Sequence, residues 1–120
     1  MFLKTNSGTA YIHNLDSLNL EKEIVLFIPG AGMDHRVADL ITPNPRIFNK
    51  VLSIDLPGHG GSTSTGAKSI EEYANFISNC ISKIDISGIH LCGHSMGGLV
   101  AMELAASISG ILKSVTLFNC

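Results

Sequence analysis

A serine set between glycines is the pattern in this sequence with the clearest chemical meaning. Residues 93–98 read Gly-His-Ser-Met-Gly-Gly and match G-x-S-x-G around Ser95. A strand-like apolar run precedes the match and a helical pattern follows it, which predicts a very tight turn with the Ser95 hydroxyl at its tip. Side chains at Gly93 and Gly97 would collide with that turn or with the neighbouring strand. N–H groups at the start of the following helix would face negative charge developing beside Ser95, as in acyl transfer.

Two more glycine-rich turns follow strand-like runs. Residues 27–34 read Phe-Ile-Pro-Gly-Ala-Gly-Met-Asp, and residues 55–62 read Asp-Leu-Pro-Gly-His-Gly-Gly-Ser. A glycine-rich turn directly after a buried strand can place backbone N–H groups beside the serine turn. Ser and Gly continue to cluster up to residue 69, which indicates a loop.

Short apolar runs alternate with helical patterns along the chain. Residues at helical spacing from Ile70 to Ile84 predict a helix of about four turns, with Ser69 as N-cap and Glu72 completing a capping box. Residues 96–107 predict a helix that is apolar or small almost all round, and therefore buried on most sides. Strands buried on both faces are predicted at residues 24–28, 51–54, 89–92 and 115–118.

The remaining elements complete an α/β pattern. A short helix is expected after Asp34, ended by Pro43 and Pro45, and residues 1–5 and 9–13 could pair as a hairpin. The pattern predicts an α/β fold with a mostly parallel sheet of about six strands and flanking helices, in one partial domain over residues 1–120.

With the three glycine-rich segments in this order, the sequence resembles the α/β-hydrolase superfamily, in its serine-hydrolase form, from about Gly8 to Cys120. The resemblance implies that Ser95 is the nucleophile and that two backbone N–H groups form an oxyanion hole. One donor comes from the first glycine-rich turn, often after His-Gly. Residues 29–30 are Pro-Gly here, so Ala31 would be that donor. The other is the residue after the nucleophile, Met96.

The acid and the base that activate such a serine are not found where this fold carries them. In the α/β-hydrolase fold they follow the nucleophile in the chain. After Ser95 the sequence has no Asp and no His, and its only acid, Glu103, lies about 12 Å along the same helix. Family members continue beyond the sixth strand, through a lid and further strands that carry these two groups. We therefore expect the Asp and His to come from a missing C-terminal segment, through a truncated gene, a split chain or a partner. The isolated chain would be inactive or very weak, and residues 111–118 would form an exposed apolar edge.

The implied function is a serine hydrolase acting on an ester, amide or related acyl bond of a small molecule. An acyltransferase, a carbon–carbon bond hydrolase and a perhydrolase stay open, because fold and nucleophile do not fix the reaction. A dehalogenase is disfavoured, since that chemistry uses Asp where Ser95 stands. The alternative is a non-catalytic α/β-hydrolase remnant or binding module.

Rival sites are weaker. A dinucleotide-binding G-x-G-x-x-G starting at Gly30, with Asp55 as the ribose acid, fails because position 35 is His. No metal or other cofactor is expected, because the histidines lack helical i, i+4 spacing backed by a carboxylate. His59 is interpreted as a solvated loop residue and His94 as packing or pocket lining. Residues 34–36 are interpreted as a helix start capped by Asp34.

Composition narrows the setting. The 120 residues are 45% hydrophobic with a formal net charge of −2, and no basic patch for nucleic acid is visible. No apolar run reaches the length of a membrane span, and the first residues do not read as a secretory signal. Three well-separated cysteines, with Cys92 expected to be buried, fit a cytoplasmic setting.

Overall fold

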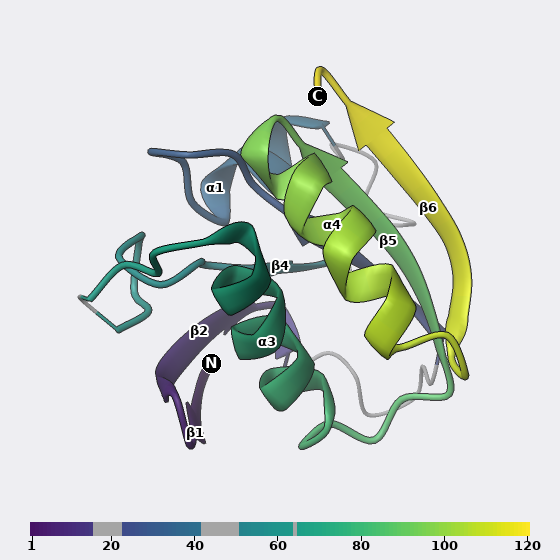
Figure 1. The fold of residues 1–120 in the computed structure, drawn as a ribbon, viewed down its shortest axis with the longest axis horizontal. Helices are drawn as coiled ribbons and strands as arrows, with labels where there is room; N and C mark the ends of the chain where they lie inside the picture. The colour runs from purple at the N-terminus through teal and green to yellow at the C-terminus, as the bar shows by residue number, and fades with distance from the viewer. Residues whose placement is uncertain (16–22, 42–50, 64) are drawn as a thin grey trace.

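The computed structural model describes residues 1–15, 23–41, 51–63 and 65–120. These residues form a six-stranded sheet with the order β1-β2-β4-β3-β5-β6, flanked by helices (Figure 1). The α/β class and the six strands were both predicted from the sequence. The strands are β1 (Phe2–Thr5), β2 (Gly8–His13), β3 (Glu23–Ile28), β4 (Val51–Ile54), β5 (Gly88–His94) and β6 (Leu112–Phe118).

Strand direction decides where the loops gather. β4, β3, β5 and β6 are mutually parallel, whereas the β1–β2 hairpin joins the sheet antiparallel to β4. The pairing of Ile28 with Gly93 brings the ends of β3 and β5 side by side. The segments that follow β3, β4 and β5 therefore start at one edge of the sheet, as expected at the carboxyl ends of parallel strands.

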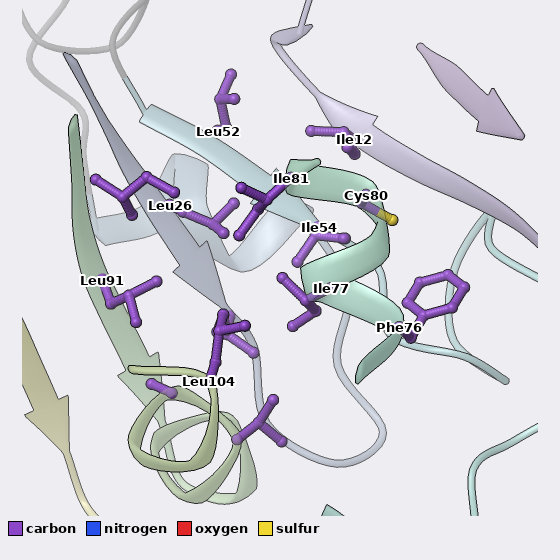
Figure 2. Packing of buried hydrophobic residues seen from close by; sticks show 14 of the residues in the cluster. Ile12, Leu26, Leu52, Ile54, Phe76, Ile77, Cys80, Ile81, Leu91 and Leu104 are labelled. Atoms are coloured by element: carbon purple, nitrogen blue, oxygen red, sulfur yellow. The ribbon is translucent and has the colours of Figure 1, made fainter. Parts of the chain in front are cut away.

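Helices lie on both faces of the sheet. α3 (Ile70–Ile81) and α4 (Met96–Ser107) pack together over one face, and α1 (Arg36–Ile41) lies on the other (Figure 1). Figure 2 shows the core beneath α3 and α4, where Ile77 and Leu104 meet side chains of the central strands. A smaller buried cluster under α1 contains Phe27, Ala38 and Val51. The continuous apolar strands of the sequence reflect this burial on two faces.

Of the two hydrogen bonds predicted for the capping box of α3, one is present and the other has a different donor. Ser69 accepts a hydrogen bond from the Glu72 amide at 3.1 Å, as an N-cap should. The Glu72 carboxylate, however, accepts from the Lys68 amide at 2.7 Å and not from Ser69, so the reciprocal bond of a capping box is shifted by one residue. The helix ends at Ile81, before the predicted Ile84. Pro43 and Pro45, predicted to end α1, lie outside the described residues.

The prediction that α4 is buried on most sides is wrong. Val100, Ala101 and Leu104 are buried against the sheet, but Leu99 and Met102 are 44% and 48% exposed. Glu103 and Ser107 are too few polar residues to mark the outer side of this helix, which is why the sequence pattern misled. Among the described strands, β6 lies at the end of the sheet, pairs with β5 alone and leaves its large side chains partly exposed. The predicted apolar edge is present.

The cysteine prediction also needs correction. Cys80 on α3 is the buried thiol (Figure 2), whereas Cys92 is half-buried and Cys120 is exposed; all three are free. Burial raises the pKa of Cys80 to about 12 and also raises the pKa of Cys92. In the described part of the chain, no helix has the length and apolar character needed to cross a membrane.

Thiol accessibility gives a test of this packing. Because thiolate is the reacting species, native Cys80 should react with a maleimide at least about 100-fold more slowly than exposed Cys120. Peptide mass spectrometry after timed quenching would measure both rates. In concentrated urea the two rates should converge. Fast native labelling of Cys80 would contradict the described packing of α3.

Candidate active site

Ser95 occupies a strained turn between β5 and α4. Its backbone has φ 54° and ψ −121°, a conformation that non-glycine residues rarely adopt and that costs about 1–3 kcal/mol. Serine at a helix start usually caps the helix with its hydroxyl, but the Ser95 side chain makes no such bond. The residue is exposed, and its amide donates to the Phe118 carbonyl at 2.9 Å. Ser95 is therefore exposed to solvent, and its hydroxyl is not used to cap α4.

The glycines around Ser95 explain how the backbone is held there. A Cβ at Gly93 would overlap the backbone of Gly97, and a Cβ at Gly97 would overlap the carbonyl oxygen of Ile28 at the end of β3. A Cβ at Gly30 would lie 3.2 Å from the Ser95 Cβ. The start of α4 and the segment after β3 therefore pack backbone against backbone.

The segment after β3 forms a turn whose second residue is Ala31. The Met33 amide donates to the Gly30 carbonyl at 3.1 Å, and Gly32 has φ +73°. A positive φ at the third position is typical of a type II turn and favours glycine there. Within the described part of the chain, the Ala31 amide has no acceptor. The amide of Met96, at the first position of α4, has no acceptor inside its own helix.

The segment after β4 anchors this turn. Asp55 is fully buried, and its carboxylate accepts from the His35 amide at 2.7 Å, from the Gly61 amide at 2.8 Å and from the His35 ring at 3.0 Å. A Cβ at Gly60 would overlap this carboxylate, so Gly60 leaves the room that Asp55 needs. His59, interpreted as a solvated residue, is instead half-buried and accepts from the Gly32 amide at 2.9 Å. That interpretation is wrong.

The residues before α1 have two roles. Asp34 accepts from the Arg36 amide at 3.0 Å, as the predicted cap, and the Arg36 guanidinium lowers the pKa of Asp34 to about 2. His35 is more than part of a helix start: it binds Asp55 and stacks on His13 with ring centroids 5.0 Å apart. Because Asp55 is buried beneath these contacts, it cannot reach a ribose.

The other acidic and histidine side chains considered as partners of Ser95 either lie away from its turn or make no hydrogen bond there in the part of the chain that the structure describes. Glu103 is exposed on α4, and His90 binds Glu23 and Ser114 near the other end of the strands. His94 lies beside Gly30, and its Nδ1 is buried without a hydrogen-bond partner among the described residues. Over the same residues, no group of three or more His, Cys, Asp and Glu side chains is placed to hold a metal ion.

A mostly parallel sheet with a strained serine between a strand and a helix defines the α/β-hydrolase class of fold. The model of the alpha/beta hydrolase family matches residues 25–118, so this chain belongs to that family. The match spans all three glycine-rich segments.

Individual relatives agree with the family. The chain is 30% identical over 103 residues to an (E)-2-((N-methylformamido)methylene)succinate hydrolase of Acinetobacter baylyi, covering 82% of this chain and 38% of the relative. It is 36% identical over 100 residues to a dihydrolipoyllysine-residue acetyltransferase component of an acetoin cleaving system of Cupriavidus necator, covering 81% and 26%. The chain thus spans well under half the length of these relatives.

A solved structure gives the same fold. The structure of an E-2-(acetamidomethylene)succinate hydrolase superposes with a TM-score of 0.78 at 21% sequence identity. The superposition covers 96% of this chain and 42% of that one. This likeness supports the fold described above, and at this identity it carries no substrate with it.

The contact at Gly97 can be tested by substitution. Gly97→Ala would drive a methyl group into the Ile28 carbonyl, so the free energy of unfolding in urea should fall by about 3 kcal/mol or more. Gly110→Ala is the matched control, because a Cβ at Gly110 meets nothing within 4 Å. It should change stability by less than about 0.5 kcal/mol. Equal effects would contradict the close packing of α4 on β3.

Proposed function

We propose that these residues are the N-terminal portion of a serine hydrolase that acts on an ester, amide or related acyl bond of a small molecule. The observation that carries the proposal is the backbone of Ser95. Ser95 combines φ 54° with ψ −121°, which lies outside the left-handed helical region and is strained for a non-glycine residue, and the close packing of Gly93 and Gly97 holds it there. This conformation keeps the hydroxyl away from its ordinary capping role and exposes it beside unused amides.

The reaction assigns a role to each group. Ser95 Oγ attacks the acyl carbon while its proton passes to a histidine base, and the N–H groups of Ala31 and Met96 donate to the resulting oxyanion. Collapse of this intermediate breaks the bond to the leaving group, which takes the proton. Water then attacks the acyl-serine by the same steps and releases the acid and free Ser95. Gly93 and Gly97 keep the turn in shape.

The base and its acid partner are proposed to come from a further C-terminal segment of the protein. The low coverage of the relatives supports this, since the chain spans 38% of one and 26% of another. In the sheet of described strands, the outer edge of β6 has no neighbour and can accept a further strand. Free Cys80, Cys92 and Cys120 support a reducing, cytoplasmic setting.

The bond class rests on the relatives' names. One relative is an (E)-2-((N-methylformamido)methylene)succinate hydrolase. Another is a pimeloyl-[acyl-carrier protein] methyl ester esterase of Yersinia enterocolitica, 40% identical over 77 residues, covering 64% of this chain and 27% of the relative. Amide-like and ester bonds both pass through a tetrahedral oxyanion, so one geometry serves both. The acetyltransferase relative keeps acyl transfer to an acceptor other than water within the proposal.

Covalent labelling tests the proposal. A fluorophosphonate should modify the natural gene product that contains these residues, with the adduct mapped to Ser95 by peptide mass spectrometry. Ser95→Ala should abolish labelling, whereas Ser109→Ala, at an exposed serine beyond α4, should leave it unchanged. The isolated 120-residue chain should react at least about 100-fold more slowly, because it lacks a base.

The same experiment distinguishes the proposed hydrolase from a non-catalytic protein of the same fold. A non-catalytic remnant or binding module predicts no adduct on Ser95 in the natural gene product. An adduct on another residue, or labelling that survives Ser95→Ala, would also contradict the proposed nucleophile.

A further inference from the structure

His59 bridges two turns at the edge of the sheet. Its Nε2 accepts from the Gly32 amide at 2.9 Å, and its Nδ1 lies 3.0 Å from the Pro57 carbonyl. A carbonyl oxygen can only accept a hydrogen bond, so Nδ1 carries the proton. Nε2 accepts from an N–H group and is therefore unprotonated. The two contacts therefore fix one tautomer of a neutral imidazole. A ring held in this way is a specific acceptor for one backbone N–H.

The backbone beneath His59 is itself held in place. The His59 amide donates to the Leu56 carbonyl at 2.9 Å, and its carbonyl accepts from the Ser62 amide at 3.1 Å. Gly58 and Gly60, on either side, have φ +79° and +50°, which few other residues adopt. Buried Asp55 accepts from the Gly61 amide. The turn that carries His59 is thus tied to the end of β4.

The other side of the bridge is the turn that contains Ala31. This turn is fixed at its start, where Gly30 packs on Ser95, and at its end, where the His35 amide binds Asp55. Between these points the turn is exposed. Among the described residues, the hydrogen bond from Gly32 to His59 is the one that joins this exposed part to another segment. A Cβ added at Gly32 would meet nothing within 4 Å, so no neighbouring atom packs against that side of Gly32.

We infer that His59 is a positioning residue for the oxyanion hole: it holds the Gly30–Met33 turn so that the Ala31 amide faces the site beside Ser95. The inference rests on the proposed function. His59 does not touch the reacting atoms; it acts through Gly32, the neighbour of Ala31. An oxyanion donor is effective only when its direction is fixed before negative charge develops. Loss of the hydrogen bond between Gly32 and His59 therefore lowers the rate of attack by Ser95 more than it weakens binding of the compound attacked.

A pair of substitutions isolates the bridge. His59→Leu removes the acceptor, whereas the side-chain oxygen of His59→Gln can still accept from Gly32. His90→Leu is the matched control, since His90 also makes two polar contacts, with Glu23 and Ser114, but lies earlier on β5, away from Ser95. Melting temperatures of all variants would verify folding.

The rate of Ser95 phosphonylation by a fluorophosphonate, measured on the natural gene product, gives the functional readout. In this reaction the Oγ–P bond forms, the P–F bond breaks, fluoride leaves and the hydroxyl proton goes to the base. His59→Leu should lower the maximal rate about 10- to 100-fold with a less than about two-fold change in half-saturating concentration. His59→Gln should recover most of the rate, and His90→Leu should match the wild type.

Hydrogen exchange of the Gly32 amide, followed by NMR on the natural gene product, tests the contact separately. Exchange should be slow in the wild type and in His59→Gln, and at least about 10-fold faster in His59→Leu. Equal exchange in all three, or equal phosphonylation by His59→Leu and wild type, would overturn the positioning role. Absence of any Ser95 adduct in the wild type would instead overturn the proposed function on which this inference rests, whatever the exchange result.

Discussion

The described structure depends on one contact between backbones, where Gly97 at the start of α4 lies on the carbonyl oxygens of Ile28 and Pro29. No side chain fits between them. The contact joins the turn after β5 to the segment after β3 and leaves Ser95 between the two with a positive φ. Folding energy elsewhere in the domain must offset the cost of that conformation. The buried strands and the packing of α3 and α4 on them supply it.

The parallel topology explains why the segments after β3, β4 and β5 meet at one edge of the sheet. β3 lies between β4 and β5, so the segment after β3 touches both neighbours. On the β5 side the contact is steric, through Gly30 and Gly97. On the β4 side it is polar, through Asp55 and His59. The turn that contains Ala31 is held from both directions, which is what a preorganised hydrogen-bond donor requires.

The features that could be predicted from the sequence are those that depend on residues close together in the chain. Strand runs, the hairpin and the Ser69 cap follow from patterns within a few residues, and the requirement for Gly93 and Gly97 follows from the chemistry of a tight turn. The bonds of Asp55 to His35 and of His59 to Gly32 could not be predicted in this way, because each joins segments 20 or more residues apart. A usable signal existed: all four residues follow closely on parallel strands, whose ends meet. The exposed side of α4 was missed because Leu99 and Met102 look like core residues to any pattern based on polarity.

The most direct measurement of the central claim is a crystal structure of the natural gene product carrying a phosphonate on Ser95. Our account predicts a phosphonyl oxygen about 3 Å from the backbone nitrogens of both Ala31 and Met96, with φ of Ser95 still positive. A phosphonyl oxygen that points to solvent, or a Ser95 that relaxes to helical φ and caps α4 with its oxygen, would contradict it.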